Sequence, residues 1–251
     1  MFQREDRGST AVIRFAHGKV SALDADFCAA LTAEIVALES SDSTSLVLTG
    51  TGSTFSAGVD LFAVLKSDDT YVGRFLPAMD DFFRSLLSFP KPLVAAVNGH
   101  AIAGGCIVAS ACDYRVMAEG RGGIGIPELI VGVPFPALPF EIMASRLTPQ
   151  VLRDLVFSGR IVSGPDVVRC GLIDEVAPAD EVLDRALQHA DRLARIPPAT
   201  FELTKRAFAA PVLHRVGLAA ADAPAVLDTW RSDAVHQSIQ QYLSRTINKR
   251  A

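Results

Sequence analysis

Short apolar runs that alternate with amphipathic stretches constrain the fold of this chain more than any other feature. Three such runs, bounded by turn residues, are predicted strands: residues 10–16, 43–50 and 91–99. Between the first two, after the potential N-cap Asp24, four apolar residues share one face of a predicted helix: Phe27, Leu31, Ile35 and Leu38. A second helical segment, residues 74–89, ends before Pro90. Alternation of strands and helices predicts an α/β core.

In the second half of the chain, the predicted segments are mostly helical. After one more predicted strand at 112–118, Thr148-Pro149 and Ser163 to Pro165 open two helices, and residues 178–196 form a longer amphipathic one. From Ile196 onward every readable segment is helical, with a linker between the stretches 197–210 and 232–250. We therefore expect a core over residues 1–195 and a helical extension over residues 196–251, which either caps the core or packs on another subunit.

Composition and charge narrow the class of protein. The 251 residues are 49% hydrophobic and 21% charged, and the net charge is −4, which gives no electrostatic case for nucleic acid or an anionic membrane. No apolar run is long enough to cross a bilayer, and the N-terminus lacks an apolar signal region. The four cysteines form no CxxC pair, and no cluster has metal-ligand spacing. We expect a soluble cytoplasmic protein without a metal.

Two loops rich in glycine follow two of the predicted strands. In "TGSTFSAGVDL", Gly58 permits an unusual turn that leaves the amide of Val59 free to donate. In "VNGHAIAGGCIVASAC", the amide of Gly104 lies at the start of a helix, where unpaired donors and the helix dipole favour negative charge. Each loop alone is compatible with a plain turn. Together, after two strands of one sheet, they predict two amides aimed at one oxyanion.

One acidic residue stands out in the following segment. Glu128 lies in "GIGIPELIVGVPFPALPF", a stretch otherwise nearly free of charge. Burial in apolar surroundings disfavours a charged carboxylate, so its pKa should rise towards that of a useful base. The alternative is a structural acid paired with an arginine such as Arg146. By contrast, Asp113 is expected to tie a turn and Glu119 to be a surface charge.

Two other reactive side chains receive structural interpretations. His100 lies on a turn flanked by glycine and has no visible partner, so we expect it to belong to the loop structure. Cys106 is expected to pack in the interior.

These motifs resemble those of the crotonase superfamily, the enoyl-CoA hydratases and isomerases. The similar segments are "FSAGVDL", "KPLVAAVNGHAIAGGCIVASACDYRVMA", "GIPELIVGV" and "FSGRIVSGPDVVRCGLIDEVAP", and the resemblance extends over essentially the whole chain. It implies a spiral of β-β-α repeats with C-terminal helices that help to build a homotrimer or a dimer of trimers. It also implies an acyl-CoA thioester as substrate, with coenzyme A as part of the substrate and no separate cofactor.

The resemblance assigns roles to individual positions. The thioester oxygen would lie between the amides of Val59 and Gly104, and Glu128 would be the catalytic acid–base group. The residues implied in substrate binding are Ser56, Ala57, Gly58, Asp60, Leu61 and Ile107, and Lys205 is one possible partner for the CoA phosphates.

The chain departs from the hydratases at one position. Enoyl-CoA hydratases carry a second catalytic glutamate on the helix after the glycine loop, where this chain has Ile107. Hydration needs a water held between two acid–base groups, whereas isomerisation of a 3-enoyl-CoA needs one base that moves a proton from C2 to C4. The chain is therefore most similar to Δ3,Δ2-enoyl-CoA isomerases of fatty acid metabolism.

Other interpretations stay open. Dienoyl-CoA isomerases and aryl-CoA dehalogenases, which are similar in fold, use an aspartate in or near the stretch between Glu128 and Glu141. This chain has no aspartate there, which argues against both activities. A hydratase that relies on Glu128 nearly alone, another acyl-CoA reaction, and a non-catalytic acyl-CoA binding subunit are the alternatives. "VPFPALPF", residues 133–140, replaces glycines common in hydratases with prolines and bulky groups, so a different acyl pocket is possible.

Overall fold

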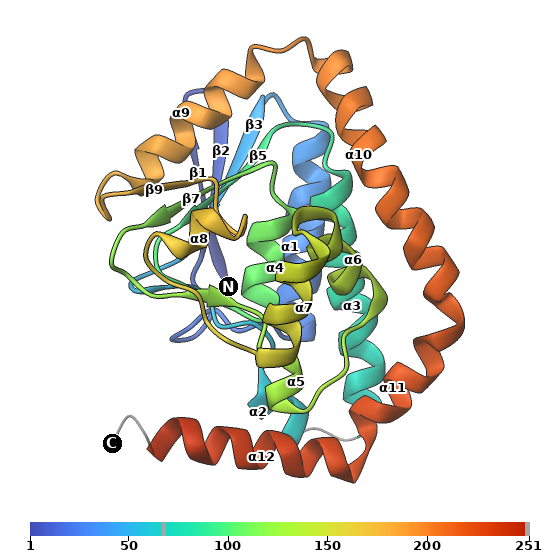
Figure 1. The fold of residues 1–251 in the computed structure, drawn as a ribbon. Helices are drawn as coiled ribbons and strands as arrows, with labels where there is room; N and C mark the ends of the chain where they lie inside the picture. Colours follow the sequence, from blue (N-terminus) through green and yellow to red (C-terminus); the bar gives the residue numbers. More distant parts are fainter. Residues whose placement is uncertain (67–68, 249–251) are drawn as a thin grey trace.

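A long sheet forms the base of the molecule. The computed structural model describes residues 1–66 and 69–248. Within them, six strands follow the order β1-β2-β3-β5-β7-β9 (Figure 1). Their bounds are Phe2–Arg7, Thr10–Phe15, Ser45–Thr49, Leu93–Val97, Tyr114–Ala118 and Glu175–Ala177. β1 runs antiparallel to β2 and the remaining pairs are parallel. The four strands predicted from apolar runs are confirmed as β2, β3, β5 and β7.

A second, smaller sheet carries the glycine loops. Its strands are β4 (Thr54–Ser56), β6 (His100–Ile102) and β8 (Ile124–Gly125), all parallel. Each follows a strand of the large sheet and precedes a helix, which gives the repeats β3-β4-α2, β5-β6-α4 and β7-β8-α5. The expected crotonase-like spiral of β-β-α units is therefore confirmed. The three helices are α2 (Leu61–Lys66), α4 (Gly104–Ala111) and α5 (Glu128–Val131).

Both faces of the large sheet are covered, because its strands alternate between two hydrophobic clusters. Ile13 and Leu48 face the main core, whereas Val12 and Val47 face a second cluster. α1 (Ala25–Glu39), α3 (Asp69–Ser88) and α4 supply the main core, and α9 (Val182–Ala194) covers the opposite face. The predicted cap of α1 is confirmed, since the carboxylate of Asp24 accepts from the amide of Phe27 at 2.7 Å.

Three further helices follow the last repeat. They are α6 (Ala137–Arg146), α7 (Pro149–Ser158) and α8 (Asp166–Arg169). The predicted start of α7 is confirmed, because the Thr148 side chain accepts from the amide of Val151. The helix predicted after Pro165 is a single turn, closed at Cys170.

The C-terminal helices form an arc around the core (Figure 1). They are α10 (Pro198–Leu218), a 3₁₀ turn (Ala219–Asp222), α11 (Ala223–Arg231) and α12 (Asp233–Asn248), while residues 249–251 of the expected extension lie outside the described residues. The expected linker over residues 211–231 was wrong, because α10 continues through Pro211 to Leu218 and an alanine-rich stretch with Pro224 in its first turn forms α11. Among the described helices, none combines the length and apolar character needed to cross a membrane.

Candidate active site

In the first glycine loop, the amide of Val59 points away from the neighbouring segment at Leu23. Gly58 has a φ of 78°, and its carbonyl accepts from Leu23 at 2.7 Å. The amide of Asp60 donates back to Leu23 at 2.9 Å. The carbonyl of Gly58 and the N–H of Val59 belong to one trans peptide unit and point in opposite directions, so the N–H of Val59 points away from Leu23.

The second loop brings another amide to the same place. Ala103 adopts a φ of 52°, unusual for a residue with a side chain, and α4 begins at Gly104 directly after it. A Cβ placed on Gly58 would lie 2.8 Å from the nitrogen of Gly104, so the two backbones are in contact. Among the described residues, no acceptor is bonded to the N–H of Val59 or of Gly104. Two free donors therefore lie side by side.

Glu128 lies in the pocket that these amides line. It is the first residue of α5, 8% exposed, and one carboxyl oxygen, Oε2, is buried without a hydrogen-bond partner. Burial raises the pKa of Glu128 from 4.5 to about 8. It is the only carboxylate among the described residues that line this pocket. An unpaired, buried carboxyl group of this kind can accept and return a proton near neutral pH.

The structural alternative for Glu128, an ion pair with Arg146, is contradicted by the geometry. The Nε of Arg146 donates to the carbonyl of Ser110 at 2.8 Å, and a terminal nitrogen donates to that of Cys112 at 2.9 Å. Arg146 therefore caps the C-terminus of α4 and leaves Glu128 unpaired.

Ile107 lies at the position where the resemblance places a second acid in the hydratases. It lies in the first turn of α4, is 2% exposed and lines the same pocket. The remaining lining is almost entirely apolar, with Met79 from α3 and Phe135 and Pro139 from the segment after α5. The pocket is narrow, with a volume of about 60 Å³.

The residues expected to bind substrate divide into two groups. Ala57 and Leu61 line the pocket, as does Ile107. Ser56 and Asp60 instead shape the loop. The hydroxyl of Ser56 donates to the carbonyl of Ser21 at 2.7 Å and accepts from the amide of Gly58 at 3.2 Å.

The carboxylate of Asp60 caps α2. It accepts from the amides of Phe62 and Ala63 at 2.9 and 3.0 Å. Ser56, Gly58 and Asp60 thus hold Val59 in place without lining the pocket themselves.

The suggested contact of Lys205 with CoA phosphates was wrong. Its side chain is 9% exposed and its Nζ lies 2.8 Å from the carboxylate of Asp113 and 3.2 Å from the carbonyl of Lys91. This buried ion pair fastens α10 to the end of the large sheet. Asp113 also accepts from the amide of Leu93 at 2.8 Å, so its expected role in tying a turn is confirmed.

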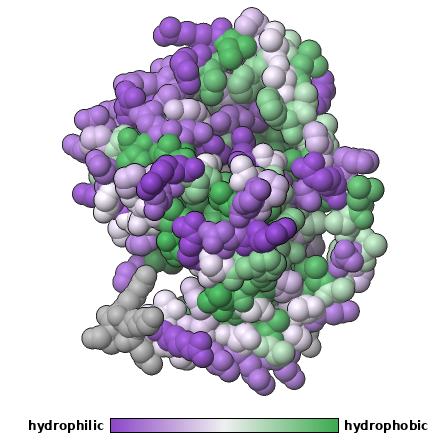
Figure 2. All heavy atoms as spheres, viewed as in Figure 1, coloured by the Kyte–Doolittle hydropathy of each residue, from purple (hydrophilic) through white to green (hydrophobic). Residues whose placement is uncertain are grey.

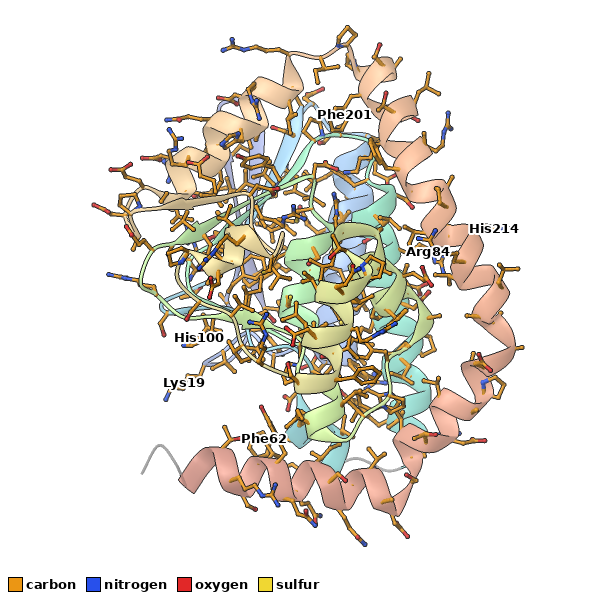
Figure 3. The ribbon with its side chains drawn as sticks, in the orientation of Figure 1. Lys19, Phe62, Arg84, His100, Phe201 and His214 are labelled. Atoms are coloured by element: carbon orange, nitrogen blue, oxygen red, sulfur yellow. The ribbon has the colours of Figure 1, made fainter. Side chains whose placement is uncertain are left out.

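The interpretations of His100 and Cys106 hold. His100 is exposed and is labelled at the left of Figure 3, and its Nδ1 accepts from the amide of Gly123 at 3.2 Å. Cys106 is fully buried, and burial raises the pKa of its thiol well above the usual range. Among the described residues, no group of three or more His, Cys, Asp or Glu side chains is arranged to hold a metal ion.

Sequence reasoning expected the C-terminal extension to cap the core, but it did not name the residues that these helices bring to the pocket. Trp230 of α11 and Tyr242 of α12 line the pocket, and α12 passes beside α2, next to the labelled Phe62 (Figure 3). The indole of Trp230 donates to the carbonyl of Pro134 at 3.1 Å. Trp230 is the single tryptophan of the chain, and this could have marked it as a candidate pocket residue. Helical spacing alone, however, does not show which cavity its side chain faces.

Comparisons with known proteins agree with this geometry. The sequence profile of the enoyl-CoA hydratase/isomerase family matches residues 5–248. A putative enoyl-CoA hydratase from Thermus thermophilus is 35% identical over 165 residues, which are 64% of each chain, just under two thirds. The human mitochondrial enoyl-CoA delta isomerase 1 is 27% identical over 239 residues, 94% of this chain and 79% of the human one.

Solved structures show the same fold. A probable enoyl-CoA hydratase from Mycobacterium tuberculosis has a TM-score of 0.83 at 31% identity, over 89% of this chain and 94% of that one. Human mitochondrial delta3-delta2-enoyl-CoA isomerase has a TM-score of 0.91 at 24% identity, over 100% and 99% of the two chains. The chain belongs to the enoyl-CoA hydratase/isomerase family, the crotonase superfamily.

Proposed function

We propose that this protein is a Δ3,Δ2-enoyl-CoA isomerase with Glu128 as its single acid–base group. The observation that carries the proposal is the pairing of one buried carboxyl group with a hydrophobic residue, Ile107, where the hydratases would have a second glutamate. The similarity to the human delta isomerase supports the same reaction.

The reaction follows from the residues around the pocket. The carboxylate of Glu128 removes a proton from C2 of a 3-enoyl-CoA, and the electron pair moves into the thioester, which forms a dienolate. The amides of Val59 and Gly104 donate to its oxygen and stabilise the negative charge. Glu128 then returns the proton to C4, the double bond shifts to C2–C3, and the carboxylate is regenerated.

The apolar lining of the pocket keeps water away from the reacting carbons during these proton transfers. With Ile107 beside the reacting carbons, no second carboxylate is present among the described lining residues to activate a water molecule. Loss of one of two acid–base groups lowers a rate by about two to four orders of magnitude, so the 2-enoyl product is expected to leave without hydration.

The other features of the family complete the proposal. Acyl-CoA is the substrate, and no separate cofactor takes part. Residues 1–195 form the core that binds it, and residues 196–251 close the pocket and contribute to a homotrimer or a dimer of trimers. A cytoplasmic location is proposed from the sequence alone.

An enoyl-CoA hydratase is the second candidate. It is favoured by the names of the Thermus thermophilus and Mycobacterium tuberculosis relatives. This reaction would require Glu128 to activate water without a second carboxylate from α4.

The two reactions are separated by ultraviolet absorbance of the conjugated thioester. With a 3-enoyl-CoA, the wild-type protein is expected to produce a rising absorbance, and Glu128→Gln is expected to lower the rate at least about a thousandfold. Glu119→Gln, which neutralises an exposed carboxylate, serves as the matched control and should leave the rate unchanged. A flat trace with 3-enoyl-CoA, together with falling absorbance on 2-enoyl-CoA, would establish the hydratase instead. No change with either substrate would favour another acyl-CoA reaction or a binding subunit.

A further inference from the structure

A large apolar cavity adjoins the narrow pocket of Glu128. It has a volume of about 830 Å³ and lies between α3, α6, α10 and α11, which supply most of its lining residues. Its apolar lining comes from each of these helices: Leu76 and Pro77, Phe140, Val216, Val226 and Leu227. We call this cavity the distal compartment.

Phe135 and Pro136 separate the two spaces, because both residues line the pocket and the distal compartment. The backbone of this wall is held in place: Pro134 and Pro136 restrict it, and Trp230 donates to the carbonyl of Pro134 at 3.1 Å. The ring of Phe135 packs edge-on against Phe140, with 6.2 Å between the ring centroids. Of the two residues that line both spaces, Phe135 is therefore the one whose side chain can turn, while Pro136 is fixed by its ring.

The sizes of the two spaces decide where a long acyl chain can go. At about 60 Å³, the pocket beside Glu128 has room for only a few carbon atoms, the reacting ones. The distal compartment falls in the range of pockets that enclose whole small molecules, roughly 300–1,000 Å³. An acyl chain that continues past C4 needs an apolar path. The distal compartment offers one, because it begins at Phe135 and Pro136, which also line the pocket of Glu128.

Four charged residues line the distal compartment: Asp80, Arg84 and Glu141 form ion pairs, and Asp222 is exposed to solvent. Arg84 of α3 pairs with Asp80 at 2.9 Å, and Glu141 of α6 pairs with Arg215 of α10. Arg84 is labelled in Figure 3 between α6 and α10. The methylene groups of an acyl chain can therefore pack beside these ion pairs without burying an unpaired charge.

We propose that the distal compartment binds the end of the substrate's acyl chain, so that the protein prefers medium-chain and long-chain 3-enoyl-CoA thioesters over short ones. This inference rests on the proposed isomerase function for its substrate. Each buried methylene group strengthens binding about fourfold, so three of them give a preference of about 60-fold.

The test compares two chain lengths and two filled variants. Val216→Trp and Leu227→Trp place a large ring in the distal compartment from α10 and from α11. His214→Trp, on an exposed position of α10 (Figure 3), is the matched control. Rates are measured with 3-hexenoyl-CoA and 3-dodecenoyl-CoA, and thermal unfolding verifies that each variant is folded.

We expect wild type and His214→Trp to prefer the twelve-carbon substrate in kcat/KM. The filled variants should lose at least tenfold with this substrate and stay within about twofold with the six-carbon one. The two chains differ by six methylene groups, and displacing three of them from the compartment would cost about 60-fold. Equal rates for both lengths in wild type, or equal losses for both in the filled variants, would overturn the proposal. A change of oligomeric state in the filled variants with an unaltered length preference would also overturn it, because a second copy would then occupy the compartment.

Binding separates this inference from the isomerase proposal. Calorimetry with hexanoyl-CoA and dodecanoyl-CoA, which carry no double bond, requires no turnover. Tighter binding of dodecanoyl-CoA that disappears in Val216→Trp supports the compartment even when no isomerase activity is found. Equal affinity for both thioesters contradicts the compartment even when the isomerase is active.

Discussion

At the scale of single residues, Glu128 combines a functional advantage with a cost in stability. Its Oε2 atom is buried without a partner, and burial raises its pKa to about 8. A paired carboxylate would be a better structural element and a much weaker base, because a positive neighbour lowers the pKa. The separation of Arg146 from Glu128 keeps the acid reactive.

The first prediction at this scale concerns the pH dependence of activity. Because Glu128 must be ionised to remove a proton, kcat/KM for a 3-enoyl-CoA should rise by nearly tenfold per pH unit below its pKa of about 8, and level off above it. Initial rates between pH 6 and pH 9.5 measure this profile. A rate that is constant over the range, or that falls as pH rises, would show that the basic form of Glu128 is not required.

The second prediction concerns stability. A carboxyl group whose pKa is higher in the folded state than in the unfolded state lowers the stability of the fold as pH rises from the unfolded value to the folded value. A rise from 4.5 to about 8 corresponds to a loss of at most about 5 kcal/mol above pH 8. Glu128→Gln, which cannot ionise, should therefore raise the free energy of unfolding by about 1 kcal/mol or more at pH 9, and bring no such gain at pH 5.

Urea unfolding at the two pH values measures this difference. Glu119→Gln removes the same charge from an exposed position and should change stability little at either pH. Equal effects of Glu128→Gln at pH 5 and pH 9 would indicate that burial does not raise the pKa of Glu128 in solution.

At the scale of structural elements, the two glycine loops depend on close backbone contact. A Cβ on Gly58 would meet the carbonyl of Ile102 at 2.6 Å and the nitrogen of Gly104 at 2.8 Å. Gly52, on the preceding turn, has a comparable positive φ of 63° with open space around it. An alanine at Gly52 would therefore introduce backbone strain alone, whereas an alanine at Gly58 would add a clash that displaces the loops.

Gly58→Ala should lower kcat for a 3-enoyl-CoA at least about a hundredfold, because a shift of the Val59 or Gly104 amide removes an oxyanion donor. Gly52→Ala should cost about 1–2 kcal/mol of stability from the left-handed backbone and leave kcat nearly unchanged. Steady-state kinetics and thermal unfolding of both variants test this. Similar kcat values for the two variants would argue against the paired-amide site.

The same elements show what the sequence predicts and what it does not. β2, β3, β5 and β7 can be predicted from the sequence because each is a short, nearly continuous apolar run that is buried on both faces. The free amides can be predicted because glycines follow strands. β8 has two residues and is held by pairing with β6, so its own sequence carries little signal. The partner of Lys205 was also out of reach, because Asp113 lies 92 positions away along the chain.

At the scale of the whole molecule, the C-terminal arc leaves large apolar side chains in solvent. On α10, Leu203 is 57%, Phe208 79% and Leu218 71% exposed, and Phe157 of α7 is 69% exposed. Apolar residues also appear on the face shown in Figure 2, among polar ones. Exposed aromatic and aliphatic side chains on one helix are typical of a surface that contacts another protein.

The proposed trimer would cover these side chains, and this gives the last prediction. Light scattering at micromolar concentration should give a mass three or six times that of the 26.7-kDa chain. Phe208→Glu should shift the assembly towards the monomer, because a buried, unpaired charge in an interface costs several kcal/mol. Thr204→Glu places the same charge on an exposed polar position of α10 and should leave the mass unchanged. A wild-type protein that remains monomeric would contradict the proposed assembly, and its pocket would then be closed by its own α11 and α12 alone.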